Sequence, residues 1–463
     1  MEQMSLDKIA SACGGTYYGN DASRSLEVSS VSIDSRKIEK NGLFIPIRGA
    51  RVDGHKYIPQ VMKAGALCTL SEKLLEGVAY SYILVDSCEQ ALKEIAAYYR
   101  STLHIKVVGI TGSVGKTSTR EMIASVLEQK YKVLQTEGNY NNAIGLPLTI
   151  FKIKKEHEIA VLEMGISDFG EMEELAKIAR PDICVITNIG YSHIEFLKSR
   201  EGILKAKTEM FQYMNPEATI ILNGDDDMLA TVGKTKGVVP KFFGMKEGYS
   251  IYASSIHSLG LKGTSCLMHF PEESIEVTVS IPGIHMIYNA LAGATVGLEL
   301  SLTIDEIKQG IEALQLVEGR GNILEIGGLT IIDDCYNANP VSMKASLDTL
   351  SCSKGRKVAV LGDMGELGLE KKELHFEIGT YVVEKGIDCL YCIGELAKEY
   401  AAGAARASAA REQKSCTCMY FETKEEFKIC MPKLISKGDT VLVKASHFME
   451  FPVIVDALKQ TEI

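Results

Sequence analysis

The sequence has no long apolar run. No segment approaches the roughly 18 uninterrupted apolar residues that a membrane-spanning helix requires, so we expect no transmembrane segment. The first residues, Met1 to Asp7, lack the basic region and the apolar core of a secretory signal. The 12 cysteines are scattered without the spacing of a disulfide framework, which is typical of a reducing compartment. We therefore expect a cytoplasmic protein.

The sequence also lacks an excess of positive charge. It holds 50 Lys and Arg residues against 60 Asp and Glu residues, a net charge of −10. This balance argues against a nucleic-acid partner and against an anionic membrane surface, because both attract basic patches. Any phosphate binding must therefore be local, through a turn and a few cations.

Two sequence motifs of cofactor and metal sites are missing or incomplete. No GxGxxG sequence follows the strands expected after residue 319, so we do not expect a dinucleotide cofactor. The stretch Cys389 to Cys392 spells CxxC, but it has no second copy and lies in an apolar run typical of a strand. We favour two buried thiols there over a zinc or redox site.

A glycine-rich stretch organises the chain. Val107 to Ile110 indicates a buried strand end, and Thr117 to Leu127 carries helix-forming residues. Backbone N–H groups in the turn between them, with the positive end of the helix, can cradle phosphate oxygens. Lys116 can reach the outer phosphates and the Thr117 hydroxyl can ligate magnesium. We expect an ATP site that is formed by Gly112, Ser113, Val114, Gly115, Lys116, Thr117 and Ser118.

This phosphate-loop pattern departs from the strict one at a single position. The strict pattern has a glycine where Ile110 stands, with Gly109 one place earlier and Gly112 inside the turn. The alternative is a glycine-rich turn with a chance Lys-Thr pair, and it stays open on this pattern alone.

Polar residues close several apolar runs between residues 103 and 318. The repeat of strand, polar turn and helix predicts a parallel sheet with helices on it, whose ligands bind at the carboxyl ends of the strands. Glu163 ends the run from Ile159 to Leu162, the usual place of a magnesium ligand or a water-orienting group. The alternative for Glu163 is a solvated strand-end acid. His193 follows the next run and, taken alone, is better explained as a structural histidine.

The two outer parts of the chain carry similar signals. The run from Val28 to Ile33 predicts a strand, and the polar turn of Asp34, Ser35 and Arg36 after it could bind a nucleotide or a sugar or be ordinary loop chemistry. After residue 319, four apolar runs each lead into a polar turn, and Arg320 between two glycines suggests a hinge.

These patterns predict an α/β protein of three domains. The length of 463 residues is enough for two to four domains, each with its own core. We expect a small mixed α/β N-terminal domain over residues 1–102 and a central parallel-sheet domain of the P-loop ATPase type over residues 103–318. A C-terminal Rossmann-like domain would follow over residues 319–463.

The order of the motifs resembles the Mur ligase family of ATP-dependent amide-bond ligases. The resemblance covers nearly the whole chain and rests on several motifs besides the phosphate loop. They are Asp34-Ser35-Arg36, Leu43 to Pro46, Asp53-Gly54-His55, Asn139 to Pro147, Glu163, Pro282 to His285, Asn289, Asp334 to Pro340, Gly362 to Gly368 and Val443 to Ser446.

The resemblance implies a particular reaction and particular partners. Within the family, the motifs are most similar to the type that joins D-alanyl-D-alanine to UDP-N-acetylmuramoyl-tripeptide, a step of peptidoglycan synthesis in the cytoplasm. It also implies ATP as a substrate, two magnesium ions and an acyl-phosphate intermediate. We expect a monomer that binds no nucleic acid and does not insert into a membrane.

The resemblance also implies roles for individual residues. Lys116 would act in catalysis, and magnesium would be held by Thr117, Glu163, His193 and a carbamylated Lys207. The nucleotide would be framed by Asn142, His285, Asn289, Arg320 and Asp334. The UDP-sugar end would be bound by Asp34, Ser35 and Arg36, and the reacting ends by Tyr336, Asn337, Asn339, Lys444, Ser446 and His447.

Two positions depart from the family pattern. Met286 stands where the family often has asparagine, and His447 stands where it usually has arginine. Without an arginine guanidinium at position 447, which is always charged and can form two parallel hydrogen bonds, an acceptor carboxylate would be held differently. Three alternatives remain: a related ligase with a different acceptor, a generic P-loop kinase or motor, and a paralogue that binds the UDP-muramoyl ligand without catalysis.

Overall fold

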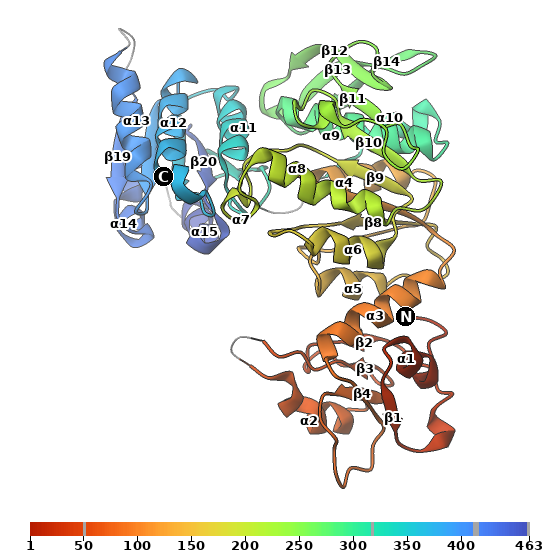
Figure 1. The fold of residues 1–463 in the computed structure, drawn as a ribbon. Helices are drawn as coiled ribbons and strands as arrows, with labels where there is room; N and C mark the ends of the chain where they lie inside the picture. The colour runs from red at the N-terminus through yellow and green to blue at the C-terminus, as the bar shows by residue number, and fades with distance from the viewer. Residues whose placement is uncertain (50–51, 316–318, 411–415, 461–463) are drawn as a thin grey trace.

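The computed structural model describes residues 1–49, 52–315, 319–410 and 416–460. Three β-sheets follow one another along the chain, each with its own helices, and they confirm the expected α/β fold of three domains (Figure 1). Among the described residues, no helix is long and apolar enough to cross a membrane.

The N-terminal sheet has five strands in the order β1-β5-β4-β3-β2. Only β1 is antiparallel to its neighbour, and the other pairs are parallel. The strands are β1 (Thr16–Tyr18), β2 (Val31–Ser32), β3 (Leu43–Phe44), β4 (Cys68–Ser71) and β5 (Tyr82–Leu84). The helices are α1 (Leu6–Ala12), α2 (Ile58–Lys63) and α3 (Cys88–Ser101), with 3₁₀ turns η1 (Asp21–Ser23) and η2 (Gly54–Tyr57).

The strand expected over Val28 to Ile33 is shorter in the structure, because only Val31–Ser32 pairs with β3. The backbone N–H of Val28 donates instead to the carbonyl of Met4 at 3.1 Å. The apolar run therefore changes partner partway along, which a single sequence does not reveal.

The central sheet has nine strands in the order β14-β13-β12-β11-β10-β9-β6-β8-β7. They are β6 (Lys106–Thr111), β7 (Val133–Gln135), β8 (Ile159–Glu163), β9 (Ile183–Ile186), β10 (Thr219–Asn223), β11 (Lys241–Gly244), β12 (Ile251–Ser258), β13 (Thr264–His269) and β14 (Ser274–Val279). The helices are α4 (Lys116–Leu127), α5 (Gly145–Ile150), α6 (Glu171–Ala179), α7 (Ile194–Leu197), α8 (Arg200–Thr208), α9 (Ile284–Glu299) and α10 (Ile304–Glu312), with 3₁₀ turns η3 (Glu209–Gln212), η4 (Leu229–Thr231) and η5 (Gly260–Lys262).

The strands of this sheet from β7 to β12 are parallel, and every residue of β8 and β9 is buried. Such uniformly apolar strands form when helices cover both faces of a parallel sheet. The expected repeat of strand and helix ends at β12, because β13 pairs antiparallel with both β12 and β14. A tight turn, in which the Phe270 N–H donates to Glu273 O at 2.8 Å, replaces a crossover helix there.

The C-terminal sheet has six strands in the order β15-β16-β20-β17-β18-β19, with β15 antiparallel and the rest parallel. They are β15 (Asn322–Ile326), β16 (Leu329–Asp333), β17 (Lys357–Gly362), β18 (Cys389–Ile393), β19 (Thr417–Phe421) and β20 (Thr440–Lys444). The helices are α11 (Pro340–Ser351), α12 (Lys371–Glu384), α13 (Lys398–Ala409), α14 (Lys424–Leu434) and α15 (Pro452–Gln460), with 3₁₀ turns η6 (Gly368–Glu370) and η7 (His447–Met449).

The cysteines of the CxxC sequence lie on opposite faces of this sheet. Both belong to β18 and both are buried, with Cys389 in the core on one face and Cys392 in the core on the other. The thiol of Cys392 lies 3.8 Å from that of Cys418 on the neighbouring strand.

One hydrophobic core runs from the N-terminal sheet into the central sheet. Helix α3 lies beside α5 and α6 (Figure 1), and its Tyr99 hydroxyl donates to the carbonyl of Ile153 at 2.6 Å. The guanidinium of Arg100 donates to the carbonyl of Ala179 at 2.9 Å. The predicted boundary at residues 102 and 103 falls just after this bridging helix.

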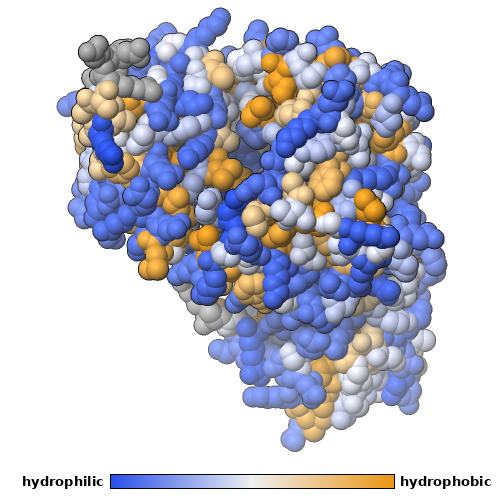
Figure 2. All heavy atoms as spheres, turned by 45° about the horizontal axis from the view of Figure 1, so that its top comes forward, coloured by the Kyte–Doolittle hydropathy of each residue, from blue (hydrophilic) through white to orange (hydrophobic). Residues whose placement is uncertain are grey.

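The C-terminal part lies to one side of the central part and has its own cores on the two faces of its sheet (Figure 1). Figure 2 shows a recess between the C-terminal part and the central part. The face around it is mostly hydrophilic, with scattered groups of hydrophobic residues. Polar contacts join the central and C-terminal parts, such as Asn339 Nδ2 with Ser192 Oγ at 3.3 Å.

Candidate active site

The glycine-rich turn connects β6 to α4 as the sequence predicts. Gly115 stands at the N-cap of α4 with φ of 79°, a left-handed conformation that favours glycine, and no side chain caps the first N–H groups of the helix. At Gly112, a Cβ atom would lie 1.9 Å from Thr187 Oγ1, so only glycine fits. The start of α4 therefore presents open backbone donors and the positive end of the helix, which together bind anions.

The neighbouring strand β9 holds this turn in place. Asn188 accepts from the Val114 N–H and donates to the Val114 carbonyl, each at 2.9 Å, and Thr187 Oγ1 donates to the same carbonyl at 2.7 Å. The sequence indicated a polar strand end here but not this role. Thr187 and Asn188 can support the turn because β9 pairs with β6, and a single sequence does not show this pairing.

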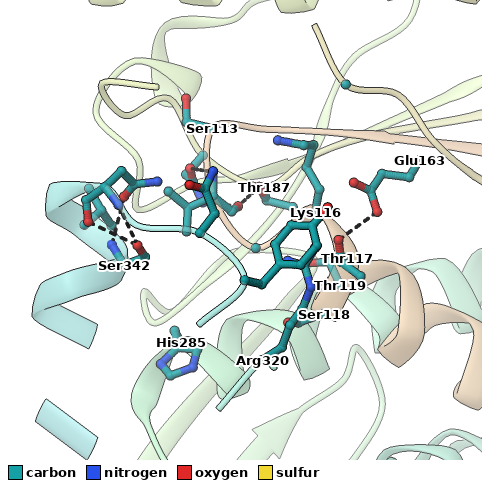
Figure 3. Close-up of a pocket in the computed structure, with 18 of the residues that line it drawn as sticks. Ser113, Lys116, Thr117, Ser118, Thr119, Glu163, Thr187, His285, Arg320 and Ser342 are labelled. Atoms are coloured by element: carbon teal, nitrogen blue, oxygen red, sulfur yellow. Dashed lines mark hydrogen bonds between the residues drawn. The ribbon is translucent and has the colours of Figure 1, made fainter. Parts of the chain in front are cut away.

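Lys116 is the first residue of α4, and its ammonium donates to the Gly112 carbonyl at 2.9 Å. Burial lowers the pKa of Lys116, while the nearby Glu163 carboxylate acts in the opposite direction. The side chain folds back over the turn, in the position from which it can meet the outer phosphates of a nucleotide (Figure 3).

Glu163 is the last residue of β8 and lies opposite Ile110 of β6, next to the turn. It is 2% exposed. Its Oε2 accepts from Thr117 Oγ1 at 2.9 Å (Figure 3), and its Oε1 accepts from Asn141 Nδ2 at 2.8 Å. A buried carboxylate beside a hydroxyl is a set of oxygen donors that magnesium prefers.

Arg120 is a site residue that the sequence analysis did not identify. It is 3% exposed, and its guanidinium lies 3.3 Å from Glu163 Oε2 and 3.0 Å from Glu121 Oε1. It also donates to Gln135 Oε1 at 3.1 Å, which fixes its position. A cation so close to Glu163 keeps that carboxylate oriented toward Thr117. Its signal in the sequence is a charged residue on the same helix, three positions after Thr117.

His193 precedes α7 in a left-handed conformation with φ of 60°. Its Nδ1 lies 2.7 Å from Glu366 Oε2 of the C-terminal part, and this contact lowers the pKa of Glu366. The predicted metal ligand thus pairs here with an acid from the Gly362 to Gly368 motif, a pairing that the sequence analysis did not foresee.

Lys207 lies in α8 and is 1% exposed. Burial lowers its pKa well below the ordinary value, and repulsion from the Lys116 ammonium adds to the effect. Within the described residues, it belongs to none of the salt bridges. A buried, uncompensated lysine of this kind favours the neutral amine.

A second group of predicted residues lies at the carboxyl edge of the C-terminal sheet. The Lys444 ammonium, 2% exposed, pairs with Asp334 and donates to the Asn337 carbonyl at 3.0 Å. Ser446 Oγ accepts from the Gly365 N–H at 2.8 Å and donates to the Ala338 carbonyl at 3.3 Å. These side chains tie the loops at this edge to one another.

Arg320 and Tyr336 stack against each other beside the phosphate-binding turn. The guanidinium of Arg320 lies 3.7 Å from the centre of the Tyr336 ring. His447 is exposed in η7, with its ring 5.7 Å from that of Tyr336. The Arg320 side chain reaches the turn from the C-terminal part (Figure 3).

Helix α9 brings a third group of predicted residues to the site. Asn289 Oδ1 accepts from Thr119 Oγ1 at 2.9 Å, and its amide contacts the Met286 sulfur at 3.3 Å. Met286, which differs from the family pattern, is therefore in direct contact with Asn289. His285 is exposed on the first turn of the same helix (Figure 3).

A cavity of about 820 Å³ unites these groups across the central and C-terminal parts. Seventeen of the predicted residues line it: Ser113, Val114, Gly115, Lys116, Thr117, Ser118, Asn142, Glu163, His193, His285, Asn289, Arg320, Asp334, Tyr336, Asn337, Asn339 and Lys444. Gly112, Lys207, Ser446 and His447 lie outside its lining.

Asp34, Ser35 and Arg36 do not line this cavity either, since they follow β2 in the N-terminal part. Arg36 and Asp34 pair with each other at 2.8 Å, and the guanidinium lowers the pKa of Asp34 to about 2. The structure therefore separates the predicted sugar-binding turn from the phosphate-binding turn.

Comparison with known protein families gives matches to three consecutive Mur ligase domains. The Mur ligase family catalytic domain matches residues 27–100, the Mur ligase middle domain matches residues 110–297, and the Mur ligase glutamate ligase domain matches residues 319–447.

Two curated relatives match along their whole length. UDP-N-acetylmuramoyl-tripeptide–D-alanyl-D-alanine ligase of Bacillus subtilis (strain 168) is 35% identical over 470 residues and covers 100% of both chains. The enzyme of the same name from Escherichia coli (strain K12) is 31% identical and covers 99% of each chain.

Solved structures show the same architecture. A crystal structure of MurF from Acinetobacter baumannii superposes with a TM-score of 0.91, at 29% identity and 100% coverage of both chains. MurF ligase from Thermotoga maritima in complex with ADP superposes with a TM-score of 0.82, at 30% identity over 93% of this chain and 97% of the other. From its domain order, its full-length relatives and its fold, the chain belongs to the Mur ligase family.

Proposed function

We propose that the protein is an ATP-dependent ligase that joins D-alanyl-D-alanine to UDP-N-acetylmuramoyl-tripeptide, a step of peptidoglycan synthesis. The full-length similarity to ligases of that name supports this reaction. The main structural support for this reaction is the shared cavity. The uncapped start of α4 at Gly115 lines it together with Arg320 and Asp334 of the C-terminal part. ATP and the substrate carboxylate that attacks it must lie in one shared cavity to react.

The reaction has two steps. A carboxylate is a poor acyl donor, so the tripeptide carboxylate first attacks the γ-phosphorus of ATP, giving an acyl phosphate and ADP. The amine of D-alanyl-D-alanine then attacks the acyl carbon, the nitrogen loses a proton to the solvent, and phosphate leaves from the tetrahedral intermediate as the amide forms. The uncapped N–H groups at the start of α4 and the Lys116 ammonium stabilise the phosphoryl charge that develops in the first step.

The donors at the head of α4 fit a magnesium ion. Thr117 Oγ1 and Glu163 Oε2 lie 2.9 Å apart and supply a hydroxyl and a carboxylate, while Arg120 orients the acid. A magnesium ion held by Thr117 and Glu163 would neutralise phosphate charge during phosphoryl transfer. His193 would help to hold a second ion once its contact with Glu366 is released.

We also propose that Lys207 is carbamylated. Its buried, neutral amine can attack carbon dioxide and lose a proton, giving a carbamate whose oxygens are acceptable magnesium ligands. Its low pKa and its lack of a salt bridge within the described residues support this modification.

The substrate ends are assigned by position. Asp34, Ser35 and Arg36 bind the UDP-sugar end on the N-terminal part, and Tyr336, Asn337, Asn339, Lys444, Ser446 and His447 lie near the reacting ends. Asn142, His285, Asn289, Arg320 and Asp334 frame the nucleotide. The exposed imidazole of His447, at the position where the family pattern usually has arginine, is the group that meets the acceptor carboxylate. We expect the enzyme to act as a cytoplasmic monomer.

The direct test is product analysis. The purified chain is incubated with ATP, magnesium and D-alanyl-D-alanine, and is offered UDP-muramoyl tripeptides that end in lysine or in diaminopimelate. We expect ADP release and a mass gain of one dipeptide minus water with one of the two. ATP turnover without ligation, or ligation to a shorter UDP-muramoyl precursor, would contradict the proposal.

A further inference from the structure

Three side chains with metal-ligating atoms meet in the N-terminal part, away from the cavity described above. They are His55 of η2, Glu72 just after β4, and Cys88, the first residue of α3. A ring nitrogen of His55, a carboxylate oxygen of Glu72 and the sulfur of Cys88 all lie within 4.8 Å of one another. Imidazole, thiolate and carboxylate are the ligand types of protein zinc sites.

The imidazole of His55 is already oriented toward this cluster. Its Nδ1 lies 2.7 Å from Asp53 Oδ1, and its Nε2 accepts from the backbone N–H of Glu72 at 3.4 Å. With the proton on Nδ1 toward Asp53, the single lone pair of Nε2 becomes available to a metal ion when it gives up the long contact with the Glu72 N–H. A carboxylate behind the ring of a metal-binding histidine is the usual way of fixing its orientation.

The sulfur of Cys88 lies at a distance that suits a shared metal ion. It is 3.7 Å from His55 Nε2. Bonds of about 2.3 Å to sulfur and about 2.0 Å to nitrogen, at a tetrahedral angle, separate the two ligand atoms by roughly 3.5 Å. Cys88 is 0% exposed, and the side chains of His55 and Glu72 are 16% and 17% exposed. An ion would therefore reach the cluster from the side of His55 and Glu72.

Glu72 completes the cluster and balances its charge. Its Oε1 accepts from the Cys88 N–H at 3.0 Å, and its Oε2 lies 2.9 Å from the Arg48 guanidinium, so each oxygen keeps a lone pair. Once an ion displaces the proton of the buried Cys88 thiol, the thiolate and the carboxylates of Asp53 and Glu72 supply three negative charges against one positive charge from Arg48. The remainder of two negative charges matches a divalent cation.

We propose that His55, Glu72 and Cys88 form a binding site for a zinc-like divalent cation, with a fourth position open to water. The three ligands come from separate elements, so the ion cross-links η2, the end of β4 and the start of α3. Such a link stabilises the folded N-terminal part in proportion to the affinity for the metal. The competing description is a plain S–H···N hydrogen bond from Cys88 to His55.

Cobalt(II) distinguishes the two, because tetrahedral thiolate coordination gives a charge-transfer band in the near ultraviolet and d–d bands in the visible. The full chain is reduced, freed of metal and titrated with cobalt(II), and zinc(II) is then added. We expect bands that saturate at about one equivalent and disappear on addition of zinc, with a rise in melting temperature of a few degrees.

Matched variants locate the site. Cys88→Ser should abolish the charge-transfer band. Cys13→Ser removes another thiol of the N-terminal part, one that contacts the Ile9 carbonyl at 3.1 Å, and should keep the band. Cys418→Ser should also keep it, which excludes the Cys392–Cys418 pair. If Cys88→Ser does not fold, His55→Gln and Glu72→Gln should each weaken cobalt binding by about 10-fold or more.

A cobalt band that persists in Cys88→Ser would overturn the proposal. So would a parent protein that shows no thiolate band at millimolar cobalt, since the hydrogen-bonded description predicts that result. These readouts report on the metal directly and do not depend on the ligase reaction.

Discussion

Two helices that begin at the carboxyl edges of parallel sheets differ in how they begin. Helix α4 starts at Gly115 without a side-chain cap. Helix α11 is capped by Asn339, whose side chain accepts from the Ser342 N–H at 2.9 Å while the Ser342 hydroxyl accepts from the Asn339 N–H at 3.0 Å. The first end keeps its donors free for an anion, and the second satisfies its donors internally.

The difference explains why polar strand ends alone do not identify a phosphate site. The C-terminal edge carries Asp334, Lys444 and Ser446, which contact each other or neighbouring backbone. The central edge carries Lys116 and Thr117 around an open turn. What distinguishes them is the presence of unsatisfied backbone donors rather than the number of polar side chains.

The largest effect should come from Lys116→Ala. Removing the ammonium takes away a charge that matters most as phosphoryl charge develops, so we expect turnover to fall by about 10²-fold or more with a smaller change in KM. Steady-state kinetics measure this, and far-UV circular dichroism checks the fold. Lys106→Ala, on the exposed start of β6, is the matched control. Near-normal turnover in Lys116→Ala would remove the basis for placing ATP at the uncapped end of α4.

A second large effect is expected from Lys207→Ala. Loss of the carbamate should lower turnover by about 10-fold or more, and a small carboxylate at high concentration should restore part of it by filling the vacated space. Lys205→Ala, on the exposed side of the same helix, should change little. The mass of the intact protein at high bicarbonate gives an independent reading. Full activity of Lys207→Ala in buffer depleted of carbon dioxide would show that the lysine is not modified.

A moderate effect, on stability, should follow from Asn339→Ala. The variant removes the cap of α11 and should lower the free energy of unfolding by about 1 kcal/mol, as measured by urea denaturation. Ser342→Ala removes only the reciprocal hydrogen bond and should cost less. If Asn339→Ala were neutral, the internally satisfied helix end would not be a stabilising feature, and the contrast with α4 would lose its meaning.

The smallest effect should come from Met286→Asn. The substitution replaces a sulfur contact of Asn289 by an amide, and one hydrogen bond contributes about 1 kcal/mol. We therefore expect the KM for ATP to change by no more than about fivefold, with turnover nearly unchanged. A change of 100-fold would mean that Met286 sets the geometry of the nucleotide site rather than filling space in it.

Much of the fold and of the phosphate site could be predicted from the sequence because the signals are local. The strand, the glycine turn and the helix from Val107 to Leu127 are contiguous, and Glu163 stands at the end of an unbroken apolar run. The three-domain α/β architecture likewise follows from repeated strand and helix patterns. The roles of the site residues stay predictions.

The features that could not be predicted depend on pairing between distant segments. Thr187 and Asn188 hold the turn only because β9 lies beside β6, and His193 meets Glu366 only because the C-terminal part lies against α7. The antiparallel strands β13 and β14 have no α-helix directly before them, and nothing in their composition marks the change. Sequence periodicity describes one element at a time and does not say which element is its neighbour.

The bridging helix α3 has a consequence for how the protein unfolds. Its buried apolar residues belong to a single core that continues from the N-terminal sheet into the central sheet, whereas the cores of the C-terminal sheet are separate. Cooperative units follow cores rather than domain boundaries drawn along the sequence. The first two sheets should therefore melt in one transition and the C-terminal sheet in another. A fragment that begins at residue 103 would expose the faces of α5 and α6 that α3 covers.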